Sequence, residues 1–169
     1  ETPLEGGPRG VAPPPPERLR LVQWNVEKGL RFERVAAALA EHPDLAGADV
    51  VFLNEVDLGM ARSGNRHVAR ELAERLGMHW VFAPAHVELT KGVGPDLDAP
   101  GENAAGLQGN AILSRHPLAG ARVVGLPVCF EPYHFHEQRY GRRVGVVARV
   151  EAAFGSVDLA GAHLEVRNT

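Results

Sequence analysis

Three hydrophobic runs that each end on a polar residue constrain the fold of this chain more than any other feature. The runs cover residues 19–25, 49–55 and 157–163, and they end on Asn25, Glu55 and His163. Short apolar runs of this kind are typical of strands buried in a sheet. Ligands and catalytic groups gather at the carboxyl ends of strands in an α/β sheet. We therefore expect the three polar side chains to share one site, and we expect the chain to be part of an enzyme.

Two helices are predicted between these runs. The first is indicated by apolar residues at helical spacing ahead of Pro43, namely Phe32, Val35, Ala36 and Leu39. The second is predicted to begin at a capping Asn65 and to end at Gly77, with an apolar stripe of Val68, Leu72 and Leu76.

Further strands are predicted over residues 79–82 and 109–115, and a hairpin joins residues 142–150 to 156–163. Residues 84–108 are rich in Gly and Pro and lack periodicity, so we expect a long loop there that is either functional or disordered. Helices are predicted in the first half of the chain and mostly strands in the second half. This order favours a layered α+β or α/β sandwich with a mixed sheet.

Residues 1–17 are rich in Pro and Gly and cannot bury a core, so we expect a disordered tail followed by one domain over residues 18–169. A single cysteine, Cys129, excludes an internal disulfide and a multi-cysteine zinc site. No apolar stretch approaches the roughly 20 residues that cross a bilayer, so we expect no transmembrane segment and a soluble domain. The sequence does not define its compartment.

The charge balance bears on the choice of partner. The chain carries 18 basic and 21 acidic residues, a formal charge of −3, so no global positive field attracts nucleic acid or an anionic membrane. Nucleic acid is a possible partner through a local basic groove, but the charge does not indicate it.

Glu55 is the best candidate for a metal ligand. A carboxylate at a buried strand end is costly unless a cation meets it, and hard divalent cations prefer carboxylate and amide oxygens. Asn25 could supply a second oxygen ligand or a supporting hydrogen bond. His163 could stabilise a phosphate or transfer a proton, because its charge changes near neutral pH. Asn110 reaches the same edge if its strand runs antiparallel to the others.

Each of these residues also has a structural explanation. A lone carboxylate at a strand end is often a cap or an ion-pair partner, an asparagine often forms a turn, and a single histidine is often a hydrogen-bonded structural residue. Spacing alone leaves both explanations open.

Other clusters are weaker candidates. His134 and His136, with Glu131 and Glu137, fit either a metal site or the lining of a cleft. Arg139, Arg142 and Arg143 fit either a phosphate site or a solvated strand edge. Asp96 and Asp98 in the long loop fit either ion binding or plain solubility.

Four segments carry a resemblance to a known family. In chain order they are Gln23–Val26, Phe52–Asp57, Gly109–Arg115 and Gly161–Glu165. Together they resemble the endonuclease/exonuclease/phosphatase family, which includes DNase I-like nucleases, inositol-polyphosphate phosphatases and neutral sphingomyelinases. The segment Arg62–His67 is also similar to members of this family, and a capped helix start is its structural explanation. The resemblance covers about residues 19–169, and the ordered set is much more specific than any one motif.

The resemblance implies a four-layer αββα sandwich with mixed, largely antiparallel sheets, and hydrolysis of a phosphate ester that depends on Mg²⁺, with Mn²⁺ as an alternative. By carry-over, Glu55 would ligate the metal and Asn25 would lie near the metal and the phosphate. His163 would contact the scissile phosphate, and Asn110 would help to shape the phosphate pocket. The implied reaction is the in-line attack of an activated water on a phosphodiester or a phosphomonoester.

The sequence departs from the family in one respect. Members continue past the His-Leu segment to a Gly-Asp-x-Asn motif and a terminal Asp-His pair, which supply phosphate contacts and the general base. Neither motif occurs in these 169 residues. We therefore expect the N-terminal portion of such a domain, incomplete at its C-terminal end and inactive alone.

The alternative to the enzyme is a non-catalytic binding or scaffold domain that keeps the fold without turnover. The substrate class is open between nucleic acid, phosphoinositide, sphingomyelin and other phosphate esters. Only 6% of residues are aromatic and no clear basic stripe is visible, which leans toward a small-molecule, lipid or sugar phosphate.

Overall fold

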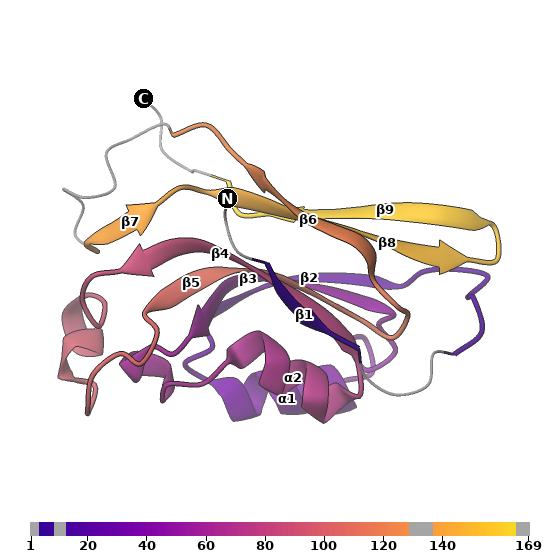
Figure 1. Ribbon diagram of the computed structural model, residues 1–169. Helices are drawn as coiled ribbons and strands as arrows, with labels where there is room; N and C mark the ends of the chain where they lie inside the picture. The colour runs from indigo at the N-terminus through magenta and orange to yellow at the C-terminus, as the bar shows by residue number, and fades with distance from the viewer. Residues whose placement is uncertain (1–3, 9–12, 129–136, 165–169) are drawn as a thin grey trace.

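Two β-sheets lie face to face, and two helices cover the outer face of the larger sheet (Figure 1). The computed structural model describes residues 4–8, 13–128 and 137–164. The larger sheet contains β1 (Glu5–Gly7), β2 (Leu21–Lys28), β3 (Val50–Leu58), β4 (His79–Glu88), β5 (Leu107–Ser114) and β7 (Arg139–Gly141). The smaller sheet contains β6 (Ala119–Gly125), β8 (Val144–Ala152) and β9 (Gly155–Ala162). The helices are α1 (Phe32–Glu41) and α2 (Val68–Leu76), and the 3-10 turns are η1 (Ala61–Ser63) and η2 (Gly94–Asp98).

The pairing of the strands confirms a mixed, largely antiparallel arrangement. In the larger sheet the order is β1-β4-β5-β3-β2, with β7 also paired to β4. Strands β2 and β3 run parallel, and the other neighbours in both sheets run antiparallel. Because α1 forms the crossover between β2 and β3, the carboxyl ends of these two strands meet at one edge. Strand β5 runs antiparallel to β3, so its first residues reach that same edge.

Strand β3 is buried on both faces because it contributes to two hydrophobic layers. Val51 and Leu53 pack in the layer between the larger sheet and the helices. Val50 and Phe52 pack in the layer between the two sheets. Gly161 of β9 lets the smaller sheet approach closely, since a Cβ there would lie 2.8 Å from the Phe52 ring. This close approach holds the end of β9 against β3.

Helix α1 buries the predicted residues Phe32, Val35, Ala36 and Leu39, and α2 ends at Gly77 in the left-handed region, as predicted. The predicted cap of α2 is wrong. His67 is the N-cap, and its ring nitrogen Nδ1 accepts a hydrogen bond of 3.4 Å from the backbone of Arg70. Asn65 instead binds a neighbouring loop, donating to the Glu102 carbonyl and accepting from the Ala104 amide, both at 3.0 Å.

The predicted loop over residues 84–108 is too long at both ends. Strand β4 continues past Pro84 to Glu88, because the ladder with β5 shifts between Pro84 and His86 and thereby tolerates the missing amide of proline. Strand β5 begins at Leu107 rather than at Gly109. The connection that remains, residues 89–106, contains η2.

Part of the predicted disordered tail is ordered. Glu5–Gly7 forms β1, which pairs antiparallel with β4, and the Glu5 carboxylate lies 3.1 Å from Nε2 of His67. The glycines favour this pairing, because a Cβ on Gly6 would lie 2.9 Å from the Trp80 carbonyl oxygen. The prediction of disorder is therefore wrong for these three residues.

The described residues form three layers, consisting of the helices, the larger sheet and the smaller sheet (Figure 1). In that part of the chain no helix covers the outer face of the smaller sheet, so the four-layer αββα sandwich stays a prediction. No described helix has the length and apolar character needed to cross a membrane.

Candidate active site

Asn25 and Glu55 meet where the parallel strands β2 and β3 end. The ladder of β2 with β3 shifts after Asn25, and the ladder of β3 with β5 shifts between Leu53 and Val56. Glu55 lies inside this second irregularity with a φ of 53°, which is uncommon for a residue with a Cβ. Such a bulge re-aims a side chain, and here Asn25 Nδ2 donates a hydrogen bond of 3.0 Å to Glu55 Oε1.

Asn25 also shapes the turn that follows it. Its Oδ1 accepts a hydrogen bond of 3.0 Å from the backbone amide of Glu27. Glu27 and Lys28 both have positive φ, 49° and 65°, and the chain then enters α1. The turn-forming role and the contact with Glu55 therefore coexist in one side chain.

His163 brings the smaller sheet to the same edge. It directly follows β9, and its Nδ1 lies 3.9 Å from Glu55 Oε1, which is too long for a hydrogen bond. The side chains of His163 and Glu55 are each about a quarter exposed, at 26% and 27%. The structure thus brings Asn25, Glu55 and His163 together at a solvent-accessible edge, while their catalytic roles stay predictions.

Asn110 lies beneath this edge rather than in it. Its side chain is buried, accepts a hydrogen bond of 2.8 Å from Asn54 and donates one of 2.9 Å to the Val144 carbonyl of β8. Asn54 in turn accepts a hydrogen bond from Gln23. This chain of amides links β2, β3 and β5 to the smaller sheet through Asn54, the residue before Glu55. Asn110 is therefore placed to position the edge.

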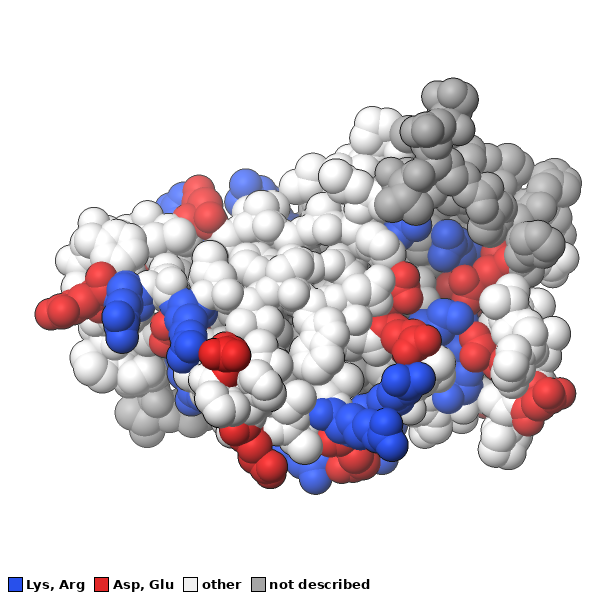
Figure 2. All heavy atoms as spheres, turned by 180° about the vertical axis from the view of Figure 1, so that it is seen from behind, with Lys and Arg blue, Asp and Glu red and all other residues white. Residues whose placement is uncertain are grey.

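A buried ion cluster lies at the same end of the larger sheet. The Arg62 cluster is defined here as Lys28, Asp57, Arg62, Glu88, Asp96 and Glu137. Arg62 forms a bidentate pair with Asp57, at 2.9 and 3.0 Å, and both side chains are at most 1% exposed. Arg62 Nη1 also donates to Glu137, and Lys28 Nζ lies 2.8 Å from Asp96. Figure 2 shows acidic and basic side chains gathered at this end of the molecule.

Burial and charge set the protonation of this cluster. Burial alone would lower the pKa of Arg62, but the hydrogen bond and the charge of Asp57 raise it, so Arg62 stays cationic. Burial raises the pKa of Glu88 to about 7, and the neighbouring charge of Glu137 acts in the same direction. Neither carboxyl oxygen of Glu88 has a hydrogen-bond partner among the described residues, and Arg62 Nη2 lies 3.9 Å from Glu88 Oε1. Glu88 is therefore partly protonated at neutral pH.

Cationic groups lie on the His163 side of the edge. Burial, followed by the charges of Arg139, Arg143 and His163, lowers the pKa of His86 to about 3, so His86 is neutral. Two members of the predicted basic cluster, Arg139 and Arg143, are therefore close to His86. Arg142 instead lies beside Gly125 of β6.

Among the described residues, the remaining sequence candidates are not brought into the edge. Glu131, His134 and His136 lie outside the described residues, and Glu137 and Asp96 belong to the Arg62 cluster. Sequence reasoning missed this cluster, although Arg62 opens a segment that the resemblance singles out. The sequence feature that could have indicated the cluster is Arg62, which lies five residues after Asp57 near the end of a predicted strand.

Glu55 and Asn25 are the residues that fit a divalent metal. Among the described residues no group of three or more His, Cys, Asp or Glu side chains is placed to hold a metal ion. Mg²⁺ is nevertheless commonly bound through one or two carboxylates, with water and substrate oxygens completing the shell. The Glu55 carboxylate is a quarter exposed, and Asn25 would offer Oδ1 after rotation of its amide. These two side chains therefore match the protein's share of such a site.

Comparisons with known proteins agree with this fold. Residues 22–158 match the sequence model of the Endonuclease/Exonuclease/phosphatase family. No curated protein matches the chain significantly. A solved endonuclease/exonuclease/phosphatase family protein from Leptotrichia buccalis C-1013-b superimposes with a TM-score of 0.55 at 16% identity. The match covers 88% of this chain but only 55% of that one, so the chain spans about half the length of this structure.

Two further solved structures are similar at lower TM-scores. The 3'-5' exonuclease NExo from Neisseria meningitidis gives a TM-score of 0.44 at 20% identity, over 81% of this chain and 39% of that one. The 3' phosphatase NExo from Neisseria bound to a product DNA hairpin gives 0.44 at 18% identity, over 83% and 40%.

Proposed function

Because this chain belongs to the endonuclease/exonuclease/phosphatase family, we propose that it forms part of a divalent-metal-dependent hydrolase of phosphate esters. The observation that carries the proposal is the convergence of Asn25, Glu55 and His163 from two sheets. Strand ends that deliver an amide, a carboxylate and an imidazole to one accessible edge supply groups that act on a phosphate.

Each side chain has a role that its surroundings support. Glu55 and Asn25 would hold Mg²⁺ or Mn²⁺, with Glu55 supplying the charge and Asn25 its amide oxygen. Without the ion, Asn25 orients Glu55 through the 3.0 Å hydrogen bond. The bound ion would polarise a phosphoryl oxygen and stabilise charge on the leaving group. His163, facing Glu55 from β9, would contact the scissile phosphate. Asn110 would keep the two sheets in register behind this edge.

The reaction proposed is the in-line attack of an activated water on a phosphodiester or phosphomonoester. The cationic groups near His86 would favour an anionic substrate on the His163 side. We further propose that residues 18–169 supply the metal-binding portion of the domain. Turnover would then need the Gly-Asp-x-Asn and Asp-His groups that the family uses and this sequence lacks.

Hydrolysis by the full-length protein tests this function. We expect activity on bis(p-nitrophenyl) phosphate or p-nitrophenyl phosphate in the presence of Mg²⁺, abolished by chelation. Glu55→Gln should lower kcat/KM by more than the roughly 10- to 100-fold that follows the loss of an outer-shell partner. Glu27→Gln is the matched control, because it removes an exposed carboxylate from the adjacent turn.

A full-length protein that folds, yet hydrolyses no phosphate ester with any divalent ion, would contradict the enzyme and leave the non-catalytic scaffold. Equal activity of Glu55→Gln and the parent protein would contradict the assignment of the metal ligand. Thermal melting of each variant separates loss of activity from loss of folding.

A further inference from the structure

Two buried side chains of opposite charge face each other across the ladder of β4 and β7 (Figure 1). Glu88 and Arg139 are register partners in this antiparallel pair, so their side chains leave the same face of the sheet at neighbouring positions. They are 4% and 7% exposed. Opposite charges at such positions stabilise a ladder when they pair. Among the described residues, however, Glu88 and Arg139 do not form an ion pair with each other.

Each of these two side chains has spare hydrogen-bonding capacity. Both carboxyl oxygens of Glu88 and Nε of Arg139 are buried and lack a hydrogen-bond partner in the described part of the chain. Arg139 Nη1 lies 3.8 Å from Glu137 Oε2, which is too long for a hydrogen bond. Because buried polar groups are costly when they stay unpaired, an arrangement that pairs Glu88 with Arg139 is accessible to this ladder.

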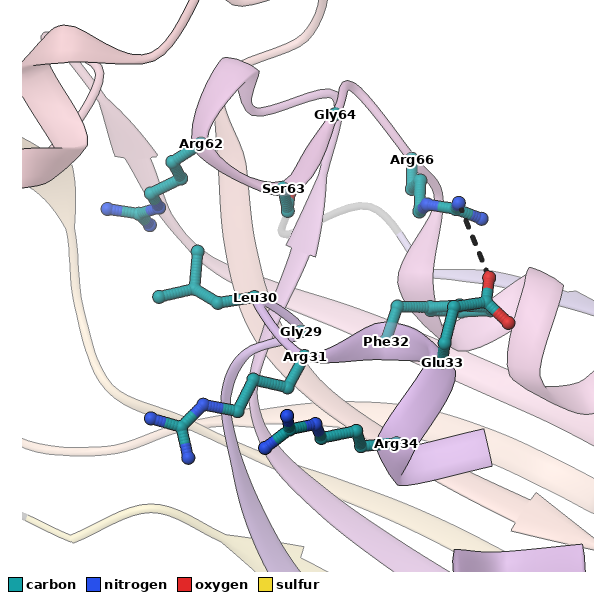
Figure 3. Close-up of a pocket in the computed structure, with 10 residues that line it drawn as sticks. All are labelled: Gly29, Leu30, Arg31, Phe32, Glu33, Arg34, Arg62, Ser63, Gly64 and Arg66. Carbon is teal, nitrogen blue, oxygen red and sulfur yellow. Dashed lines mark ion pairs between the residues drawn. The ribbon is translucent and has the colours of Figure 1, made fainter. Parts of the chain in front are cut away.

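The cations of the Arg62 cluster are already bound to other carboxylates. Arg62 extends away from the start of α1 and into its cluster (Figure 3), where it donates two hydrogen bonds to Asp57. Its Nη2 lies 3.9 Å from Glu88 Oε1. Lys28 Nζ lies 2.8 Å from Asp96. Arg139 is therefore the cation that an ionised Glu88 can recruit.

We propose that Glu88 is a positioning residue for Arg139. The ionised carboxylate holds the guanidinium across the ladder in a charge-assisted pair, and the neutral carboxyl releases it toward Glu137. The structure has Arg139 on the Glu137 side and the Glu88 oxygens without hydrogen bonds from any described residue. This arrangement corresponds to the neutral form of Glu88.

The charge of Glu88 changes near neutral pH. Burial raises its pKa to about 7, and the charge of Glu137 acts in the same direction. The charged groups that act on Glu88 are Asp57 of β3, Arg62 of η1, Glu137, and Arg139 of β7. The two arginines oppose the rise of the pKa, and Asp57 adds to it. The position of Arg139 therefore depends on pH close to neutrality.

Arg139 connects this movement to the candidate active site. Burial, and then the charge of Arg139, lowers the pKa of His86, to which His163 also contributes. His86 lies two residues before Glu88 on the same face of β4. A guanidinium drawn toward Glu88 moves away from His86 and takes positive charge from the His163 side of the edge. An effect of this movement on hydrolysis rests on the proposed function.

An NMR titration of the full-length protein tests the proposal. The sample carries isotope-labelled glutamate and arginine. The Glu88 carboxyl signal is the one that Glu88→Gln removes, and the Arg139 Nε–H signal is the one that Arg139→Lys removes. We expect the two signals to shift together as the pH is raised, with one midpoint near pH 7.

Two variants separate Glu88 from the other titrating groups. Glu88→Gln cannot ionise, so it should abolish the pH dependence of the Arg139 signal. Glu102→Gln removes an exposed carboxylate and should leave that dependence unchanged. An Arg139 signal that stays constant with pH in the parent protein, or that titrates equally in Glu88→Gln, would overturn the proposal. Neither result depends on hydrolysis, so a failure here and a failure of the hydrolase assignment are distinguishable.

Discussion

Two groups of polar side chains lie at the same end of the larger sheet: the accessible edge, formed by Asn25, Glu55 and His163, and the Arg62 cluster. They differ in how far their charged side chains are buried and paired. Glu55 is a quarter exposed and has one 3.0 Å hydrogen bond from a neutral amide, with His163 at 3.9 Å. Arg62 and Asp57 are almost wholly buried and joined by two hydrogen bonds. Both regions begin in the same strand, since Glu55 and Asp57 are two residues apart in β3.

The difference separates a binding role from a structural role. A partly exposed carboxylate with only a neutral hydrogen-bond partner can still bind a cation. A buried carboxylate that is already paired with a guanidinium cannot bind a second cation. The Arg62 cluster joins β2, β3 and β4 to η2 and to Glu137, two residues before β7. We infer that it fixes the loops around the edge, and three measurements can break or sharpen this comparison.

The largest effect is expected for Arg62→Met. Removing one partner of a buried ion pair leaves the other charge uncompensated, which costs about 3–5 kcal/mol of the free energy of unfolding. Urea denaturation followed by circular dichroism measures this change. Arg149→Ala, which breaks an exposed pair with Asp158, is the control and should leave the free energy of unfolding almost unchanged. Similar losses in the two variants would contradict a structural role for Arg62.

A pH-dependent effect is expected at Glu88. Its pKa is raised from 4.5 to about 7, mainly by burial, so the folded protein keeps a proton that the unfolded chain loses between these values. Stability from this group is fully present below pH 4.5 and is lost as the pH rises through about 7.

Glu88→Gln cannot lose a proton and removes this dependence. We expect the variant to be more stable than the parent by about 3 kcal/mol above pH 7, with the difference shrinking toward pH 5, since one pKa unit corresponds to 1.36 kcal/mol. Urea denaturation across this pH range measures it, with exposed Glu102→Gln as the control. A difference that does not change with pH would show that Glu88 is ionised throughout.

The smallest effect compares two asparagines in different surroundings. Asn110→Ala leaves a buried amide of Asn54 and a buried carbonyl of Val144 without their partner, which should cost about 1–3 kcal/mol. Asn25→Ala loses hydrogen bonds at a partly exposed edge and should cost less than about 1 kcal/mol. Thermal and urea unfolding of both variants test this. An Asn25→Ala variant that is the less stable of the two would show that the edge is built for stability.

The strands and helices were largely predictable, and the exceptions have local causes. Apolar periodicity gave α1 correctly because its buried face is formed by Phe32, Val35, Ala36 and Leu39 alone. The cap of α2 is predicted at Asn65 because asparagine favours that position. In the structure Asn65 instead donates a hydrogen bond to the Glu102 carbonyl, and His67 is the N-cap. The predicted strand ends before Pro84, because residue preferences do not indicate the bulge that lets β4 continue past this proline.

The residues of the candidate site were predictable as a set, but their arrangement was not. Polar ends on hydrophobic runs pointed to Asn25, Glu55 and His163 without showing that a bulge at Glu55 turns it toward Asn25. Asn110 could be assigned to the same edge from strand direction, but its burial between the sheets depends on the packing of β8. The four carboxylates around Arg62 come from segments up to 80 residues apart, so no local pattern joins them.

The amino-acid sequence by itself determined the polarity of each strand end, the helical faces and the family to which the chain belongs, because these depend on spacing along the chain. Only the tertiary structure decided which carboxylates stay accessible and which are neutralised. Glu55 and Asp57 are chemically alike and almost adjacent, and their difference arises from the cation and the burial that distant segments impose on Asp57. Exposure and pairing are properties of the packed sheets, and those were set by contacts far apart in sequence.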